Sequence, residues 1–246
     1  ECTPRKISRP RIITVIGELH QQGERPASLP HPAPGVAPSL PPSTGAVFPR
    51  IIRGMTLDTT ALNRQMTHFD GHDEIWLFGY GSLIWKADFP WLERRPAHIH
   101  GWSRRFWKGS HDHRGTPEAP GRVATLVRDP GALCHGMAYR ITPEVLTPLD
   151  VREKNGYLRE VVTLCFDDPA GGRAEGLVYL ATEDNAAFLG DAPLDAIAEQ
   201  IARAHGPSGP NRDYLLNLAE ALRELEVEDP HVFALATRLP ATQDDD

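Results

Sequence analysis

Long hydrophobic runs are missing from this sequence of 246 residues. No stretch approaches the ~20 consecutive apolar residues that a membrane-spanning helix needs. The apolar segment nearest the N-terminus, residues 12–17 (IITVIG), is also too short for the core of a secretory signal peptide. We therefore expect a soluble, cytoplasmic protein that has no membrane as a partner.

Cysteine and basic charge are also scarce. The three cysteines, Cys2, Cys134 and Cys165, form no spaced framework, and an odd number of scattered thiols is typical of a reducing compartment. The net charge is −7, and residues 1–54 contribute +4 to it, so the rest of the chain carries −11. Because nucleic-acid-binding domains present basic surfaces, this acidic body argues against a nucleic acid as a partner.

Proline, in contrast, is concentrated at one end of the chain. Residues 1–54 hold ten of the 23 prolines, and residues 26–45 are rich in Pro, Ala and Ser without hydrophobic periodicity. Such a segment buries too little apolar surface to offset its conformational entropy. We expect a disordered tail over residues 1–70, a catalytic domain over 71–240 and an acidic tail over 241–246. Met55 opens a more ordinary stretch, and we expect the natural start to lie close to it.

The predicted domain has strands first and helices afterwards. Apolar runs bounded by Gly, Pro or Asp-Pro predict strands at residues 74–80, 97–110, 122–129, 134–141, 159–167 and 174–182. A helical period follows at residues 193–206, 211–225 and 230–239, with Gly206 as a C-cap and Asn211 as an N-cap. This order indicates an α+β fold rather than alternating βαβ units.

The first strand ends in a glycine-rich turn, Gly79-Tyr80-Gly81-Ser82. A dinucleotide fingerprint would need a third glycine where Ile84 stands, and the Gly-Lys-Ser/Thr of a P-loop is absent from the sequence. Two interpretations remain. The glycines allow main-chain N–H groups to hold a carboxylate or an oxyanion, with the Ser82 hydroxyl beside them, or they form a tight turn without a ligand.

A second feature is a glutamate at the predicted end of a short helix. Thr147 and Pro148 suit the start of this helix, and Asn155 and Gly156 suit its end. Glu153 then lies in the last turn, where the helix dipole disfavours a charged carboxylate. Burial would raise its pKa further and make Glu153 a candidate proton shuttle. The other interpretation is a solvated glutamate at a helix end.

The neighbours of Glu153 are both basic. On a helix, the side chains of Arg152 and Lys154 point about 100° away from Glu153 on either side. We therefore expect that they need not neutralise its carboxylate.

Together with these features, several segments in order resemble the ChaC-type, glutathione-specific gamma-glutamylcyclotransferases. The resemblance runs from about Glu74 to the helix after Asn211, and Asn155 departs from it, since the family has glycine there. The segments are WLFGYGSLIWK, SRRFWKGSHDHRGTPEAPGRVATLV, GMAYRI, LDVREKNGY and LGDAPLDAIAEQIARAHGPSGPNRDYL. We expect Asn155 to preserve the turn, because Asn tolerates a left-handed conformation.

The resemblance implies a fold, a reaction and a site. The implied fold is a mixed, largely antiparallel, small β-barrel-like sheet flanked by helices. The implied reaction cleaves glutathione to 5-oxoproline and cysteinylglycine without a cofactor or a metal. The family's catalytic glutamate falls on Glu153, whereas an earlier family carboxylate matches Glu144 only across a length difference. The implied substrate-binding residues are Leu77, Phe78, Gly79, Tyr80, Gly81, Ser82 and Leu83.

Alternatives remain open beside this interpretation. One is a non-catalytic binding or regulatory module with the turn as an anion cradle, and another is a cyclotransferase for other γ-glutamyl amines. The pairs His98/His100 and His111/His113 would suit a metal, but we expect ordinary polar histidines. The sequence sets neither the oligomeric state nor whether residues 111–121 act as a lid.

Further residues were weighed as minor candidates. Cys134 and His135 should point to opposite faces of a strand, which disfavours a nucleophile pair. Tyr157, Tyr214 and the loop at residues 206–211 are candidates for the rim of the site. In the segment 104–108 (RRFWK) an arginine could lie near the substrate's carboxylates.

Overall fold

The computed structural model describes residues 58–240. The predictions for residues 1–57, including Met55 and the proline-rich segment, and for the acidic tail at 241–246 lie outside the described residues. No helix within 58–240 combines the length and the apolar character needed to cross a membrane.

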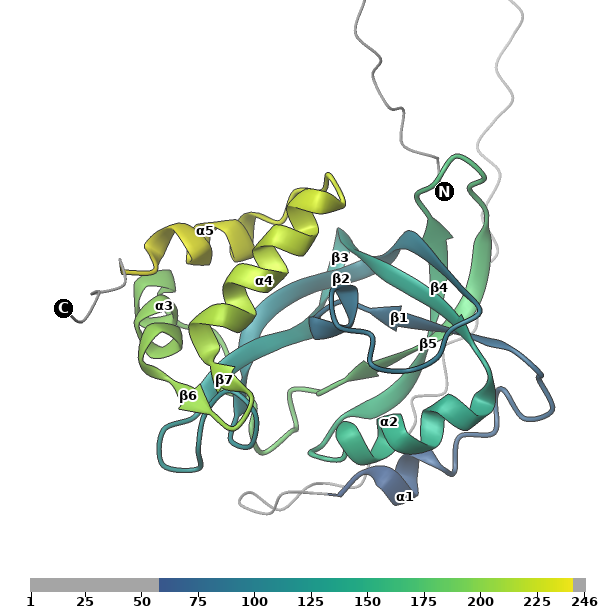
Figure 1. Ribbon diagram of the computed structural model, residues 1–246, viewed down its shortest axis with the longest axis horizontal. Helices are drawn as coiled ribbons and strands as arrows, with labels where there is room; N and C mark the ends of the chain where they lie inside the picture. The colour runs from purple at the N-terminus through teal and green to yellow at the C-terminus, as the bar shows by residue number, and fades with distance from the viewer. Residues whose placement is uncertain (1–57, 241–246) are drawn as a thin grey trace, which may run out of the picture. The chain divides into compact units, whose positions relative to one another are not determined.

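Five strands form a closed barrel in the order β1-β3-β2-β4-β5 (Figure 1). β1 pairs with β5 in parallel, and all other neighbours in the barrel are antiparallel. This confirms the predicted α+β fold with a mixed, largely antiparallel barrel. The strands are β1 (Ile75–Gly79), β2 (Glu93–Ser110), β3 (Gly121–Ile141), β4 (Leu158–Phe166) and β5 (Arg173–Leu180).

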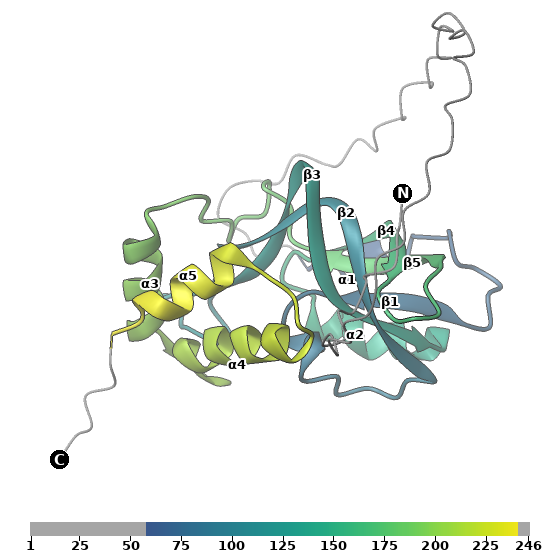
Figure 2. The same ribbon diagram turned by 90° about the horizontal axis from the view of Figure 1, so that it is seen from above.

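β2 and β3 form a long hairpin that extends beyond the barrel toward the C-terminal helices (Figures 1 and 2). The two strands predicted at residues 122–129 and 134–141 are one strand, β3, because both pair with β2. The pairing is irregular between the two predicted segments. His100 of β2 pairs with Leu133, and Trp102 pairs with Arg128, so β3 has extra residues at this point. A second irregularity, between Arg105 and Lys108, has the one extra residue of a β-bulge.

The helices lie on two sides of the barrel. Three helices pack together beside the β2–β3 hairpin: α3 (Leu194–Arg203), α4 (Asn211–Glu224) and α5 (Pro230–Arg238). Away from them, α1 (Thr60–Asn63) lies next to α2 (Leu146–Arg152) (Figures 1 and 2). A short 3₁₀ turn, Pro143–Val145, leads into α2. A two-residue hairpin, β6 (His205–Gly206) and β7 (Gly209–Pro210), connects α3 to α4.

Two predicted helix caps are wrong. α3 ends at Arg203, and Gly206 belongs to β6 instead of capping the helix. Asn211 is the first residue of α4 rather than its N-cap. Its buried amide accepts a hydrogen bond from the Arg122 N–H at 2.6 Å and donates one to the Arg122 carbonyl at 2.8 Å. Asn211 therefore ties α4 to the start of β3, a tertiary role that local sequence does not reveal.

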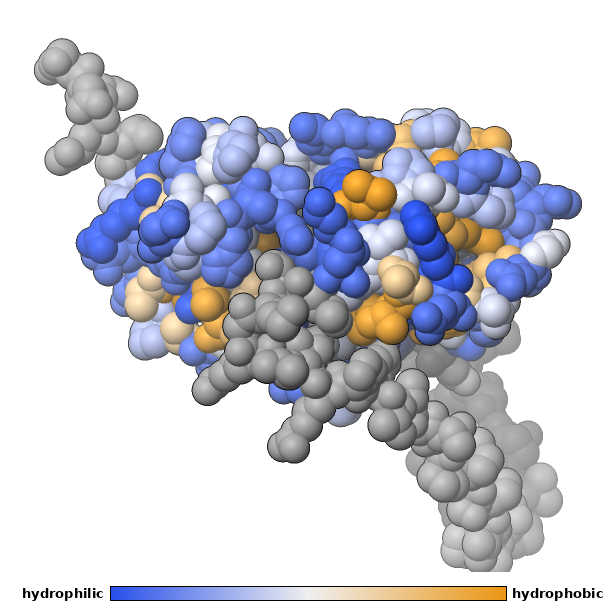
Figure 3. All heavy atoms as spheres, turned by 90° about the horizontal axis from the view of Figure 1, so that it is seen from below, coloured by the Kyte–Doolittle hydropathy of each residue, from blue (hydrophilic) through white to orange (hydrophobic). Residues whose placement is uncertain are grey.

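The core consists of two hydrophobic clusters that meet at β1. Phe78 packs in the cluster between the barrel and the C-terminal helices, whereas Ile75 and Leu77 pack in the cluster beside α2. β1 is therefore buried on both faces, as its continuous apolar sequence predicts. The face of the molecule in Figure 3 is mostly hydrophilic, with small hydrophobic patches between the polar residues.

Residues 58–70 contact the domain, although the prediction placed them in the tail. Thr59 and Asn63 are almost fully buried. The Thr59 hydroxyl donates to the Tyr157 carbonyl at 2.8 Å, and the Asn63 side chain accepts from the Arg159 N–H at 2.9 Å. The sequence signal is weak because the segment is short and its contacts come from scattered polar and apolar residues, Met66 and Phe69 among them.

Candidate functional site

The turn after β1 lines a small cavity together with the predicted glutamate. This cavity has a volume of about 60 Å³ and is lined by Phe78–Leu83, Glu153 and several tyrosines. The structure thus brings the loop and Glu153 together, although some 70 residues separate them. Leu77 is the exception among the predicted substrate-binding residues, because its side chain is fully buried in the core and is absent from the cavity wall.

The two glycines are required by close packing rather than by unusual φ angles. Neither Gly79 nor Gly81 has a positive φ. A Cβ on Gly79 would lie 2.6 Å from the Leu83 Cβ, and a Cβ on Gly81 would lie 2.8 Å from the Tyr214 hydroxyl. Both distances are far below an ordinary van der Waals contact, so side chains at these positions would displace the turn or Tyr214.

Buried side chains hold the carbonyl groups of the turn. Arg104 donates to the Tyr80 carbonyl at 2.6 Å, and the Tyr139 hydroxyl donates to the Leu83 carbonyl at 2.6 Å. The N–H and C=O of one trans peptide point in opposite directions, so Arg104 also fixes the N–H of Gly81. Within residues 58–240, the N–H groups of Ser82 and Leu83 have no main-chain acceptor. They are therefore available to a ligand.

Arg104 thus supports the turn instead of lying free near a substrate. Its guanidinium is buried and also pairs with Asp229 at 2.7 Å. The possibility of a ligand-binding arginine in the segment 104–108 does not apply to Arg104, whose charge is already paired.

Glu153 follows directly after the last residue of α2, as its C-cap. Its side chain is 19% exposed, and this burial raises the pKa of its carboxyl. The positive charges of Arg152, Lys108 and His113 oppose the rise, and Asp112 adds to it. The expectation of a partly buried glutamate with a raised pKa is met.

The expectation that Arg152 points away from Glu153 is wrong. The Arg152 Nε lies 3.3 Å from the Glu153 Oε1, and its Nη2 donates to the Ser82 hydroxyl at 3.0 Å. The two side chains are long enough to reach each other at the end of α2, where Glu153 is the C-cap with φ of −93°. Arg152 therefore connects the glutamate with the turn.

The ends of α2 also differ in detail from the prediction. The helix begins at Leu146, so Thr147 is helical and does not cap it. Asn155 does not adopt a left-handed conformation. The positive φ at the turn, 83°, belongs to Gly156. A Cβ on Gly156 would lie 2.1 Å from the Asn185 amide, which donates to the Gly156 carbonyl at 2.9 Å. Gly156 therefore forms the turn at the end of the helix, as predicted. The side-chain amide of Asn155 donates a hydrogen bond to the Asp112 carboxylate.

A larger cavity adjoins the small one. Its volume is about 360 Å³, and it shares Ser82, Glu153, Tyr157 and Tyr214 with the small cavity. Several of its charged residues come from the end of β2 and the loop after it: Lys108, Asp112, His113 and Arg114. The sequence analysis considered the loop 111–121 only as a possible lid, and it gave Lys108 no role of its own. The dense run of polar and charged residues at 108–114 was the available signal, but no spacing rule connected it with Glu153.

Tyrosines surround the carboxylate of Glu153. Burial raises the pKa of Tyr80 and Tyr157, and it raises the pKa of Tyr214 to about 12. These phenols therefore stay protonated and act as neutral hydrogen-bonding groups. Tyr157 and Tyr214, weighed as rim residues, line both cavities.

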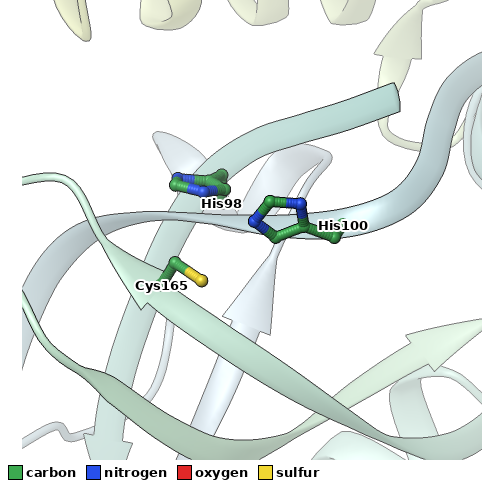
Figure 4. Close-up of side chains that lie close together, drawn as sticks. All are labelled: His98, His100 and Cys165. Atoms are coloured by element: carbon green, nitrogen blue, oxygen red, sulfur yellow. The ribbon is translucent and has the colours of Figure 1, made fainter. Parts of the chain in front are cut away.

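Histidines and one cysteine form a separate group on β2, β3 and β4. His98, His100 and Cys165 lie close together (Figure 4), with potential ligand atoms within 4.8 Å of one another. A second grouping joins His98 and His135 to Asp167, whose carboxylate lies 2.6 Å and 3.0 Å from their Nδ1 atoms. These hydrogen bonds account for His98, His135 and Asp167 without an ion, and the absence of a metal stays a prediction.

Cys134 is a poor nucleophile. Its side chain is buried, and burial raises the pKa of its thiol to about 11. A reactive thiolate is therefore disfavoured at this position.

Comparisons with known proteins place this chain in one family. Residues 75–241 match the family described as ChaC-like protein. Gamma-glutamylcyclotransferase 2-3 of Arabidopsis thaliana is 48% identical over 67% of this chain and 88% of its own length. Glutathione-specific gamma-glutamylcyclotransferase 1 of Danio rerio is 42% identical over 70% of this chain and 92% of its own length. A crystal structure of the yeast cyclotransferase specific to glutathione has a TM-score of 0.63 at 34% identity, covering 68% of this chain and 96% of that chain.

Proposed function

Since this chain belongs to the ChaC-like protein family, we propose that it is a gamma-glutamylcyclotransferase that cleaves glutathione to 5-oxoproline and cysteinylglycine. The observation that supports this most directly is the position of Glu153. A partly buried carboxylate with a raised pKa faces the same small cavity as the N–H groups of the turn after β1. Relatives of 37–48% identity carry names that state this activity or its class.

The reaction is an intramolecular aminolysis. The α-amino group of the γ-glutamyl moiety attacks its own γ-carbonyl carbon, a five-membered ring forms, and the amide C–N bond to cysteine breaks. Water takes no part. Because attacking and attacked groups belong to one molecule, the main requirement is to fold the substrate into a reactive geometry. We place the γ-glutamyl group in the small cavity, because Glu153 and the turn after β1 both line it.

Protons must move from the attacking nitrogen to the leaving nitrogen. In our proposal, Glu153 first takes a proton from the α-ammonium, which frees the nitrogen lone pair for attack. Glu153 passes this proton to the nitrogen of the leaving cysteinylglycine and can then take a second proton from the new ring nitrogen. It passes the second proton to the same amine once the amide C–N bond has broken. Both protons end on the amine of cysteinylglycine, so the sum of the reaction consumes none. The steps use no cofactor.

The turn supplies hydrogen-bond donors for negative charge. We assign the N–H groups of the Tyr80–Leu83 turn, with the Ser82 hydroxyl, to the substrate's γ-carbonyl oxygen or its α-carboxylate. Phe78 and Gly79 shape the same wall. Leu77 supports the turn from the core instead of touching the ligand. Donors in place before the reaction stabilise a developing oxyanion without reorganisation.

An assay of product formation tests the proposal. Purified protein is incubated with glutathione or γ-glutamyl-alanine, and 5-oxoproline and the released amine are quantified. We expect turnover of glutathione and little turnover of γ-glutamyl-alanine. Turnover of γ-glutamyl-alanine alone would instead indicate a cyclotransferase for other γ-glutamyl amines. Turnover of neither would favour a non-catalytic binding module.

Two further properties belong to the proposal. We place the protein in the cytoplasm, because its sequence has no long apolar run and its few cysteines form no spaced framework. We take residues 71–240 as the catalytic domain, with residues 58–70 attached to it by the contacts of Thr59 and Asn63. We expect the small-molecule substrate as its partner, and we expect it to bind neither nucleic acid nor a membrane.

A further inference from the structure

Lys108 is a buried ammonium group in the wall of the larger cavity. It stands near the end of β2, where the bulge after Arg105 changes the register of the hairpin. Bulges commonly redirect a side chain next to a functional site. The residue is 4% exposed, and it lines the larger cavity but not the smaller one.

This ammonium group lacks a partner that matches its charge. Its Nζ donates to the Gly109 carbonyl at 3.3 Å and lies 4.5 Å from the centre of the Tyr157 ring. Within residues 58–240, no carboxylate oxygen lies within 4.0 Å of its Nζ. Burial accordingly lowers the pKa of Lys108, although Asp112 and Glu153 oppose the shift. A buried charge with so little compensation is costly, and an anionic ligand would relieve that cost.

The rest of the larger cavity favours an anion as well. The guanidinium of Arg114 donates one hydrogen bond, to the Pro210 carbonyl at 3.0 Å. It has further N–H groups that can donate to a ligand. Asp112, the nearest acid of this wall, is already engaged by the Asn155 amide. The other two basic residues of this wall are already paired, Lys86 with Asp88 at 3.5 Å and Arg152 with Glu153 at 3.3 Å. Lys108 and Arg114 are therefore the cations of this wall that have no carboxylate partner within residues 58–240.

We infer that Lys108, assisted by Arg114, forms a subsite for the C-terminal carboxylate of the peptide that leaves in the reaction. The inference rests on the proposed function in one respect, the placement of the γ-glutamyl group at the turn and Glu153. With that group in the small cavity, the rest of the substrate extends into the larger one. The only anionic group of cysteinylglycine is its terminal carboxylate. Lys108 lines the larger cavity and not the smaller one. The enzyme therefore selects γ-glutamyl peptides with a free C-terminal carboxylate.

The test compares two ligands that differ only in this carboxylate, glutathione and its glycyl monoethyl ester. Their binding is measured by calorimetry in the Glu153→Gln variant, with and without Lys108→Met, so that binding is read without turnover. We expect Lys108→Met to weaken glutathione binding by about 10–100-fold, the range for a charge-assisted hydrogen bond. Binding of the ester should change by less than about twofold, because it has no carboxylate at that end.

Lys154→Met is the matched control. It removes the same charge from the segment next to Glu153, but Lys154 lines neither cavity. It should leave the ratio of the two affinities unchanged. Equal losses for glutathione and ester on Lys108→Met would overturn the inference, because they would indicate a contact with the α-carboxylate or a structural role.

Turnover separates this inference from the proposed function. If the wild-type protein releases 5-oxoproline but Lys108→Met does not change the preference for glutathione over the ester, the subsite is wrong and the function stands. If no 5-oxoproline forms but the affinity pattern is as expected, the subsite stands and the function is wrong. Absence of both turnover and the affinity pattern would refute both.

Thermal stability gives a second readout. Met is close to Lys in size and carries no charge, so Lys108→Met should raise the Tm of the protein without ligand. Glutathione should then raise the Tm of the variant less than that of its parent. A Tm that falls on substitution, with an unchanged response to glutathione, would assign Lys108 to the fold and contradict the subsite.

Discussion

Arg152 donates a hydrogen bond of 3.0 Å to the hydroxyl of Ser82, 70 residues away in the chain. The same guanidinium lies 3.3 Å from the Glu153 carboxylate. One side chain thus connects the turn after β1 with the proposed proton shuttle. Burial is the largest cause of the raised Glu153 pKa, and the charge of Arg152 limits this rise.

Replacing Glu153 by Gln should abolish most turnover without preventing binding. The amide keeps the shape of the side chain but cannot carry a proton between the two nitrogens. We expect kcat to fall by about 10²–10⁴-fold, the usual worth of a proton shuttle. Release of 5-oxoproline measures the loss, and calorimetry with glutathione shows whether binding remains. Near-full activity of this variant would remove Glu153 from the mechanism.

The same substitution should affect stability in a pH-dependent way. Burial raises the pKa of Glu153 above its unfolded value, so the folded protein disfavours the charged form. At pH values above the folded pKa, the Gln variant should therefore have a higher Tm than the wild type. Below the unfolded pKa of about 4.3 both proteins have a neutral side chain, and the difference should vanish. A Tm difference that grows toward low pH would contradict the raised pKa.

Replacing Arg152 by Met should move the acid limb of the pH–activity profile to higher pH. Glu153 acts as a base only when ionised, so kcat/KM falls as the pH drops through its pKa. Removal of a positive charge 3.3 Å away raises that pKa further. The control is Lys154→Met, since Lys154 is not among the main causes of the Glu153 shift. An acid limb that moves equally in both variants would argue against a specific role of Arg152.

Truncation before residue 58 and truncation before residue 71 should have different effects. The Thr59 N–H donates to the Lys154 carbonyl at 3.0 Å and its hydroxyl to the Tyr157 carbonyl at 2.8 Å, on both sides of the turn after Glu153. A chain that starts at residue 58 keeps these contacts, and we expect near-wild-type kcat. A chain that starts at residue 71 loses them, and we expect at least a tenfold lower kcat/KM, as for a misplaced catalytic group. Equal activity of the two chains would show that residues 58–70 do not position Glu153.

Replacing Asp150 by Asn should destabilise the domain strongly. Asp150 is 1% exposed, pairs with Arg159 at 2.5 Å and accepts from the Tyr179 hydroxyl at 2.7 Å. Removal of its charge leaves the guanidinium of Arg159 buried without a counter-charge, which costs about 3–5 kcal/mol. Urea unfolding at pH 7 measures the loss. The control is Glu199→Gln in the exposed pair with Arg203, where we expect less than ~1 kcal/mol. Similar losses in both variants would show that the Asp150 pair does not anchor α2 to the barrel.

The sequence alone determined the class of fold, the order of strands and helices, and the two halves of the candidate site. A continuous apolar run predicted that β1 is a buried strand, and both of its faces are indeed covered. The turn with Gly79 and Gly81 and the glutamate at a helix end were also visible, because their signals are local. The resemblance then connected them.

Only the tertiary structure decided what surrounds these two features. Lys108 reaches the cavity because of a bulge in a long hairpin, and Asn211 forms a tertiary tie instead of a cap. Arg152 contacts Glu153 at the point where α2 ends. Gly81 is glycine because the Tyr214 hydroxyl fills the space of a side chain. Each of these contacts joins residues far apart in the chain or depends on a local departure from regular geometry. Patterns of hydrophobicity and spacing record regular local structure, and so they do not carry this information.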